Sequence, residues 1–217
     1  MEPRLNLKHL LPCLALAATA QGATAGEIYA GIGFPGATLG YAGALASNVT
    51  VRGEYAGGLS VSRNGKREGL TYQGDLKTGR AGLFVDWQPF SGSFHLTAGA
   101  TANDIKLDLN GSGTNGTING KPVDLTGETF KVQVKYARST PYLGLGWGHQ
   151  PAPGGGLGFF FDLGAQLGKF DTTVQTTIVG KYGVTQADVD AEVQKVRDTV
   201  DQLKVLPSAT IGLTYRF

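Results

Sequence analysis

The stretch of residues 206 to 217 alternates between apolar and polar positions from Ser208 onward. Ala209, Ile211, Leu213, Tyr215 and Phe217 fall on one parity, and the residues between them are small, hydroxylated or charged. A period of two is that of a β-strand whose two faces meet different environments. The apolar face could look into a protein core or into lipid, so the alternation alone does not say which side is outside.

Seven further segments show the same alternation, and we therefore expect eight strands. They cover residues 27–34, 37–45, 49–57, 77–88, 94–103, 130–148 with a break at Pro141, and 157–168. Hydrophobic residues make up only 41% of the chain, because every second strand position is polar. This composition is compatible with a membrane protein only if strands and not helices cross the bilayer. The pattern predicts an all-β fold, an eight-stranded antiparallel transmembrane β-barrel.

The connections between these segments alternate in length. Residues 46–48, 89–93 and 149–156 form short connections, whereas residues 58–76, 104–129 and 169–205 form long ones. Only the turn at Pro35 and Gly36 is short where a long loop is expected. Outer-membrane barrels have short periplasmic turns and longer external loops. We therefore place both termini on the periplasmic side, and ring closure leaves no unpaired strand edge in lipid.

The first 25 residues have the features of a secretory signal peptide. Arg4 and Lys8 precede an apolar run over residues 10–18, and small residues follow up to Ala25, where we expect cleavage. The apolar run is too short to span a bilayer, and it contains Cys13, the only cysteine. The expected organisation is a signal peptide at 1–25 and an outer-membrane β-barrel domain at 26–217, in the bacterial outer membrane.

The apolar parity of the 206–217 strand also suggests how such a barrel would be assembled. Leu213, Tyr215 and Phe217 resemble the terminal-strand signature by which the barrel-assembly machinery recognises outer-membrane barrels. We expect these three residues to act as the assembly signal. The expected partners are thus outer-membrane lipid and the assembly machinery.

Residues 185–204 break the β pattern and predict an amphipathic helix in the last external loop. Thr185 is a plausible N-cap with Asp188 three positions later, and valines at 189, 193, 196 and 200 lie at heptad-like spacing with Leu203. Two interpretations remain open. The helix either packs its valine stripe on other loops or the barrel rim, or it is a movable lid or a partner-docking helix.

The sequence offers no catalytic or metal-binding constellation. His149 falls in a periplasmic turn and His95 at the periplasmic start of a strand, so we expect no histidine near the external leaflet, where a lipid hydrolase would need one. Residues 104–111 loosely resemble a calcium loop but lack its closing Glu. We expect no enzyme activity, cofactor or metal. The formal net charge is only +2, and no basic patch apparent in the sequence suggests a nucleic-acid partner.

The inward parity of the predicted strands is charged and rich in glycine. Its charged members are Arg52, Glu54, Arg80, Asp86, Asp162 and Arg216. Charge inside a barrel is tolerated where it is paired or wet. The charges could form an ion-paired plug among tightly twisted strands, or they could line a narrow passage for a small solute. Strand register places Arg52 beside Asp86, and Glu54 beside Arg80.

Several segments resemble the CarO family of small outer-membrane proteins. They are Pro141-Tyr142-Leu143-Gly144-Leu145-Gly146-Trp147-Gly148, Gly158-Phe159-Phe160-Phe161-Asp162-Leu163-Gly164-Ala165, Ile118-Asn119-Gly120-Lys121 and an acidic, Arg-containing segment before the closing strand. Similar Gly-aromatic strands occur in other eight-stranded barrels, including the OmpW group. The resemblance implies an eight-stranded barrel proposed to admit basic amino acids such as ornithine, a small-molecule solute. The Gly/Asn-rich stretch at 110–120 departs from the family.

Two functions remain open at this stage. The first is a narrow channel for small polar or zwitterionic solutes. The alternative is a non-conducting structural or adhesive barrel whose external loops bind a partner.

Overall fold

The computed structural model describes residues 25–67, 70–113, 116–150, 155–200 and 202–217. Apart from Ala25, the predicted signal peptide lies outside the described residues. The elements are β1 Gly26–Phe34, β2 Gly36–Ala46, β3 Val49–Arg67, β4 Leu70–Trp87, β5 Phe94–Asn103, β6 Lys106–Ser112, β7 Gly116–Ile118, β8 Lys121–Val123, β9 Phe130–Tyr136, β10 Ser139–Trp147, β11 Gly156–Leu167, β12 Phe170–Thr176, α1 Gln186–Val200 and β13 Val205–Arg216.

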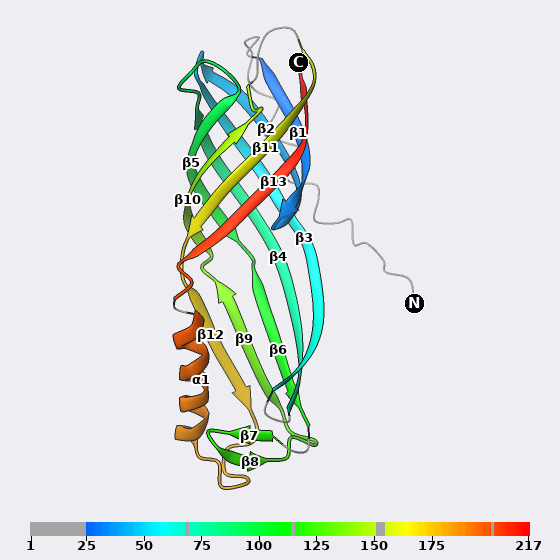
Figure 1. The fold of residues 1–217 in the computed structure, drawn as a ribbon, viewed down its shortest axis with the longest axis vertical. Coiled ribbons are helices and arrows are strands. Elements are labelled where there is room, and N and C mark those ends of the chain that lie inside the picture. Colours follow the sequence, from blue (N-terminus) through cyan, green and yellow to red (C-terminus); the bar gives the residue numbers. More distant parts are fainter. Residues whose placement is uncertain (1–24, 68–69, 114–115, 151–154, 201) are drawn as a thin grey trace, which may run out of the picture.

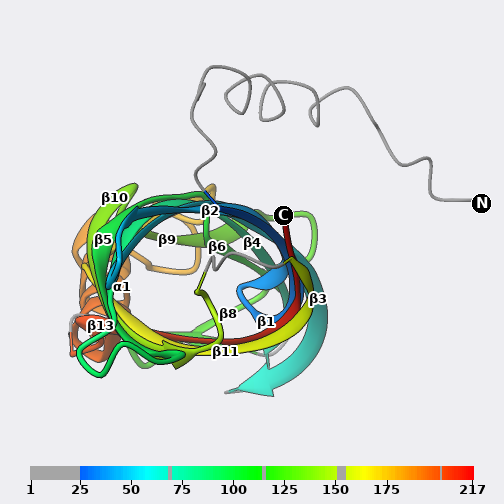
Figure 2. The ribbon, with the colours of Figure 1, turned by 90° about the horizontal axis from the view of Figure 1, so that it is seen from above.

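Eight of the strands close into a barrel. Their order around the ring is β4, β3, β2, β1, β13, β11, β10 and β5, and β5 pairs again with β4. Every pairing is antiparallel, and the view along the barrel shows the ring (Figure 2). The predicted eight-stranded antiparallel transmembrane β-barrel is confirmed. We call the end with the first residue of β1 and the last residue of β13 the terminal end.

The predicted strand over residues 130–148 is wrong, because this segment forms two strands. β9 ends at Tyr136 and β10 begins at Ser139, so only β10 belongs to the ring. The predicted break at Pro141 does not occur, since Pro141 lies within β10, opposite Ala100 of β5. The sequence alternates on both sides of Ala137 and therefore gives no sign that the chain leaves one part of the sheet and enters the ring.

The segments predicted as long loops are largely regular structure. β3 and β4 continue beyond the barrel as one long hairpin, and β6, β9 and β12 add to β4 in that order. These strands, the β7–β8 hairpin and α1 form a part that we call the extension (Figure 1). Their apolar side chains are too few to resemble lipid-facing strands. These apolar side chains are sufficient for a sheet that is exposed to water on its other face, because such a sheet needs only one apolar face.

The extension has a hydrophobic core separate from the barrel. Its buried members are Ile118, Val123, Leu125, Phe130, Val132, Val134, Ile178, Val184, Val189 and Val193. The predicted helix is present, although it ends at Val200 and not at residue 204. Its first turn has the expected capping box: the Asp188 carboxylate accepts hydrogen bonds from both the backbone N–H and the hydroxyl of Thr185. The valine stripe packs on this core, as the first interpretation of the helix expected.

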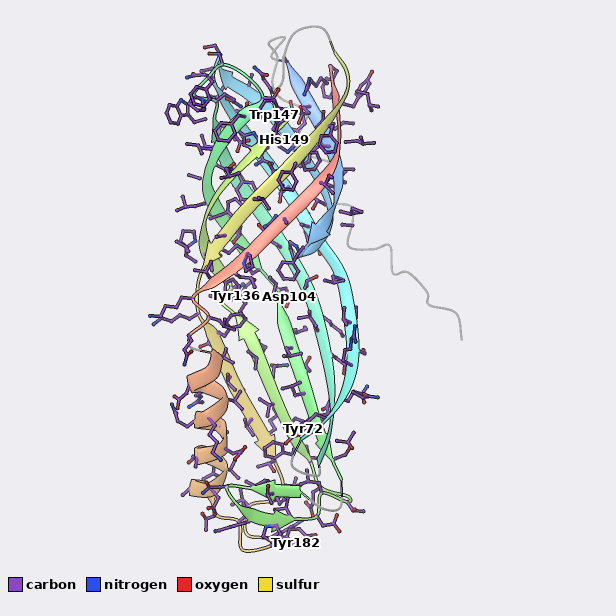
Figure 3. All side chains as sticks on the ribbon, viewed as in Figure 1. Tyr72, Asp104, Tyr136, Trp147, His149 and Tyr182 are labelled. Atoms are coloured by element: carbon purple, nitrogen blue, oxygen red, sulfur yellow. The ribbon has the colours of Figure 1, made fainter. Side chains whose placement is uncertain are left out.

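The outward face of the barrel is a belt of exposed large apolar side chains. It includes Ile28, Ile32, Leu39, Leu83, Val85, Leu143, Leu145, Phe159, Leu163, Ile211 and Leu213. Trp87 and Trp147 close their strands at the terminal end and are half exposed (Trp147 is labelled in Figure 3). Such a surface matches the apolar band and aromatic girdle of a barrel in lipid. Among the described residues, no helix is long and apolar enough to cross a membrane.

Candidate functional site: the barrel interior

Arg52 of β3 is the centre of an ion-pair network inside the barrel. Its Nε lies 2.5 Å from Asp86 Oδ2 and its Nη2 donates to Asp86 Oδ1 at 3.1 Å. Its Nη1 donates to Asp162 Oδ2 at 2.7 Å. Arg52 and Asp86 are almost fully buried, at 2% and 0% exposure. A guanidinium that contacts two carboxylates through separate nitrogens is held in one orientation.

A second arginine pairs with the remaining predicted carboxylate of β3. Arg80 Nη2 donates to Glu54 Oε1, and the Tyr29 hydroxyl donates to the other oxygen of Glu54 at 3.0 Å. Both pairs that strand register predicts, Arg52 with Asp86 and Arg80 with Glu54, are therefore present. Phe84 lies between the two guanidinium groups, 5.5 Å from Arg52 Cζ and 5.8 Å from Arg80 Cζ. These distances are within the range of cation–π attraction.

Two histidines belong to the same network: His95, on the inward parity of β5, and His149, in the connection that follows β10. His95 Nε2 lies 3.0 Å from Asp162 Oδ1. His149 Nδ1 lies 2.6 Å from Glu27 Oε1, and its Nε2 is 3.2 Å from Asp162 Oδ2. Both side chains are fully buried. His149 follows β10 in a connection that folds back into the barrel near the terminal end (Figure 3), so strand parity gave no sign of it.

Glu27 is a fourth interior carboxylate that the predicted inward set omits. It is fully buried, and Arg216 Nε donates to its Oε2 at 3.2 Å. The six predicted inward charges are three of each sign, and this predicted balance is wrong, because Glu27 brings the interior to four carboxylates against three guanidinium groups. The alternation along β1 could have identified Glu27 as an inward residue, because the next residue, Ile28, faces outward. The contacts of His149 with Glu27 and Asp162 indicate where a compensating positive charge would be held.

Aromatic rings fill the rest of the interior. Tyr29, Phe84, Tyr142 and Phe160 are all buried, and the Phe84 and Tyr142 rings lie 4.7 Å apart between centroids. Glycines on the inward parity make room for these rings. A Cβ at Gly40 would lie 2.2 Å from the Tyr29 ring, and one at Gly164 would lie 2.0 Å from the Tyr142 hydroxyl. The inward glycines at these positions accommodate aromatic side chains and do not leave an empty passage.

Some polar atoms in this interior still have no hydrogen-bond partner. Among the described side chains these include Arg80 Nε and Nη1 and Gln166 Nε2. Buried polar groups are normally satisfied by protein or water. The donors of Arg80 and Gln166 could therefore bind water molecules or the polar groups of a small solute.

The residues of the expected assembly signal lie on the outward face of the strand that closes the ring. Leu213, Tyr215 and Phe217 are each more than half exposed. The backbone N–H of Gly26 donates to the carbonyl of Phe217 at 3.0 Å, and that of Phe217 donates to Gly26 at 2.9 Å. The three side chains thus flank the seam between β13 and β1.

Outside the barrel, the polar face of the extension contains a cavity of about 640 Å³. Ser62, Asp75, Asp108 and Gln133 are among its lining residues. Asp75 accepts a hydrogen bond from Ser62, and Asp108 accepts one from Gln133. Residues 104–111, which loosely resemble a calcium loop, contribute strand β6 to this sheet.

The fold and the filled interior define a class of protein: a small, closed, eight-stranded antiparallel barrel with a large extension at one end. Two solved structures from Acinetobacter baumannii have this fold. CarO aligns with a TM-score of 0.54 and 22% identity, covering 88% of this chain and 97% of that chain. CarO2 aligns with a TM-score of 0.58 and 21% identity, covering 89% of this chain and 99% of that chain. No protein-family model and no curated protein matches the chain.

Proposed function

We propose that this chain is an outer-membrane β-barrel that is closed and non-conducting in the conformation described. The observation that carries the proposal is the bridge from Arg52 to Asp162. β11, which carries Asp162, is four strands away from β3 in either direction around the ring. An eight-stranded interior is only just wide enough for side chains to fill. A bridge across its diameter, with buried aromatic rings beside it, leaves the barrel without an open path for ions.

In this proposal the barrel's outward belt contacts outer-membrane lipid. The assembly machinery recognises the Leu213, Tyr215 and Phe217 side of β13. The extension is then the part that meets external partners. This role corresponds to the alternative of a non-conducting barrel whose external loops bind a partner.

A gated passage for small polar or zwitterionic solutes is the second candidate. The unpartnered donors of Arg80 and Gln166 favour it, because a permanently closed interior has no need for unsatisfied polar groups. A solute with both charges could exchange its ammonium and carboxylate for the members of the Arg52 and Arg80 pairs. The basic amino acids implied by the CarO resemblance belong to this class of solute.

Single-channel recording in planar bilayers separates the two candidates. The closed barrel predicts no conductance for the wild type and measurable conductance for Arg52→Ala, which loses the bridge. The gated passage predicts that the wild type already conducts, and that Arg52→Ala changes the cation-to-anion preference measured as a reversal potential. Silence of both proteins would contradict the passage and would also show that the Arg52 bridge is not what closes the barrel; the extension would then be the functional part.

A further inference from the structure

Cationic side chains gather at the level where the barrel meets the extension. They are Lys77, Lys106, Lys135, Arg138, Lys169 and Lys204, and we call them the basic collar. All are exposed except Lys106, whose side chain is partly exposed, at 31%. The exposed carboxylates at this level are Asp104 and Asp171. Asp104 and Tyr136, both labelled in Figure 3, mark the junction.

Backbone hydrogen bonds hold the collar segments at one height. The N–H of Asp104 donates to Gly79 and that of Asn103 donates to Arg138. Further around the junction, Ala137 donates to Lys169, and Gly168 donates to Lys204. The collar residues are far apart in sequence, and this belt of hydrogen bonds places them together.

The collar lies one membrane thickness from the aromatic end of the barrel. On β4, Lys77 has the same parity as the exposed Leu83, Val85 and Trp87, so its side chain continues their outward face. Ten residues of strand from Trp87 to Lys77 span roughly 33 Å at about 3.3 Å per residue. With a strand tilt of about 40°, this is a height of about 25 Å, that of the apolar band of such barrels. Lys77 therefore sits at the headgroup level of the external leaflet.

Three lysines of the collar stand directly opposite one another on neighbouring strands. Lys77 is in register with Lys106, and Lys106 is in register with Lys135. Like charges directly opposite destabilise a sheet. Among the described residues, the one ion pair of this row joins Lys106 to Asp104 at 3.9 Å, and Asp104 is 83% exposed. Asp171 stands opposite Lys135 at the end of this row, and Asp75 and Asp108 lie two positions further along the same face. The collar as a whole still has six cations at a level with two exposed carboxylates, Asp104 and Asp171. A bound anion would stabilise this excess of positive charge.

The opposite rim of the barrel has no comparable charge. The connections at the terminal end, residues 47–48, 88–93 and 148–155, contain no Lys, Arg, Asp or Glu in the sequence. The two rims therefore meet different surfaces. A strongly phosphorylated external leaflet on one side and a nearly neutral one on the other would match this asymmetry.

We propose that the basic collar binds the phosphate groups of the outer-leaflet glycolipid, and that Lys77, Lys106 and Lys135 form the main contact. The proposal rests on the outer-membrane placement proposed above. Each cation near an anionic membrane surface contributes about 1 kcal/mol. Together the three lysines should therefore change binding by a factor of about a hundred.

Native mass spectrometry of the full chain in detergent micelles tests the proposal, with bisphosphorylated lipid A as the probe. The wild type should retain lipid A far better than the fully dephosphorylated lipid. The triple variant Lys77→Gln, Lys106→Gln, Lys135→Gln should lose retention by about a hundredfold. A matched control, Lys131→Gln, Lys181→Gln, Lys195→Gln, removes the same charge from the distal extension and should retain lipid A like the wild type.

Three results would overturn the collar proposal. Equal retention of phosphorylated and dephosphorylated lipid would show that the acyl chains and not the phosphates are bound. Equal loss in both triple variants would indicate a general charge effect. Complete displacement by millimolar inorganic phosphate would identify a free-phosphate site. Insertion into phosphatidylcholine vesicles is measured separately. A protein that inserts but does not select phosphorylated lipid A contradicts only the proposal for the basic collar. A protein that fails to insert also contradicts the proposal that the chain is an outer-membrane barrel.

Discussion

Arg52 and Asp162 meet across the full width of the barrel, although 110 positions separate them in the sequence. Arg52 Nη1 donates to Asp162 Oδ2 at 2.7 Å, from strands that are four apart in a ring of eight. Asp86 binds the other side of the same guanidinium. Because each partner comes from a different strand, the network ties the walls of the barrel together as well as filling it.

Removing a member of the network should loosen and open the barrel. Arg80→Ala leaves Glu54 without its cation, and Asp86→Ala leaves Arg52 with one fewer partner. Breaking a buried ion pair costs about 3 to 5 kcal/mol, and the admission of water can relieve part of this cost. We expect both variants to lower the free energy of unfolding in lipid vesicles and to raise conductance from near zero. Arg63→Ala, which changes an exposed arginine on the part of β3 that lies in the extension, is the control and should change neither.

Part of this network could be predicted from the sequence, and part could not. Arg52 with Asp86, and Glu54 with Arg80, lie on neighbouring strands, so residue counting from a short turn gives their relative height. Asp162 could be assigned to the interior by parity. Its contact with Arg52 depends on strand tilt, stagger and side-chain rotamers, which alternation does not encode. His149 was missed because a connection, and not a strand, carries it inward.

The fold, like the network, could be predicted from the sequence only in part. Lipid-facing strands have a strong signal, because every outward residue must be apolar, and seven of the eight predicted segments correspond to ring strands. The strands of the extension bury one face in a small core shared with α1 and the β7–β8 hairpin. That core draws residues from several distant segments. No single segment therefore shows a pattern that distinguishes it from a loop.

The lipid-facing register is tested by an arginine at Leu163. Leu163 is 41% exposed on the outward face of β11, so Leu163→Arg places a cation in the apolar belt. The expected cost is about 2 to 4 kcal/mol near the bilayer midplane, measured by folding into lipid vesicles. Thr173→Arg, on the exposed face of β12, is the control and should cost little. Equal tolerance at both positions would contradict the proposed placement of the membrane.

An inward substitution beside Leu163 should fail for a different reason. A Cβ at Gly164 would lie 2.0 Å from the Tyr142 hydroxyl, so Gly164→Ala overpacks the interior at a cost of about 1 to 3 kcal/mol. Shortening the opposing side chain in Gly164→Ala, Tyr142→Leu should recover part of that loss. A double variant no more stable than Gly164→Ala would show that the glycine is not there to accommodate Tyr142.

The extension should lose structure in acid before the barrel does. Lys121 Nζ donates to Asp188 Oδ2 at 2.6 Å, and Thr185 and Asn119 donate to the same carboxylate. These hydrogen bonds, that of Lys121 first, hold the pKa of Asp188 well below its usual value. A carboxyl with a lowered pKa contributes its stability above the unfolded-state pKa of about 3.9 and loses it as the pH falls through the folded-state pKa.

Hydrogen exchange of the α1 amides, corrected for intrinsic rates, measures this effect. Protection should fall as the pH drops below about 4, while the barrel strands remain protected. Asp188→Asn should have weaker protection at neutral pH and little further loss in acid. Asp190→Asn, which changes an exposed carboxylate on the same helix, should behave like the wild type. Acid loss that is the same in Asp188→Asn and the wild type would assign it to another group.

The seam between β13 and β1 provides a test of assembly in the cell. Phe217 exchanges backbone hydrogen bonds with Gly26, and its side chain is 60% exposed beside Tyr215 and Leu213. Phe217→Ser keeps both backbone bonds but removes the outward aromatic ring, so the folded barrel should change little while recognition by the assembly machinery weakens. We expect periplasmic accumulation with normal export across the inner membrane. Phe90→Ser removes an aromatic ring that is 78% exposed in the turn between β4 and β5, and it should assemble normally. If Phe217→Ser reaches wild-type levels in the outer membrane, the ring is not part of the signal and recognition must depend on other features of β13.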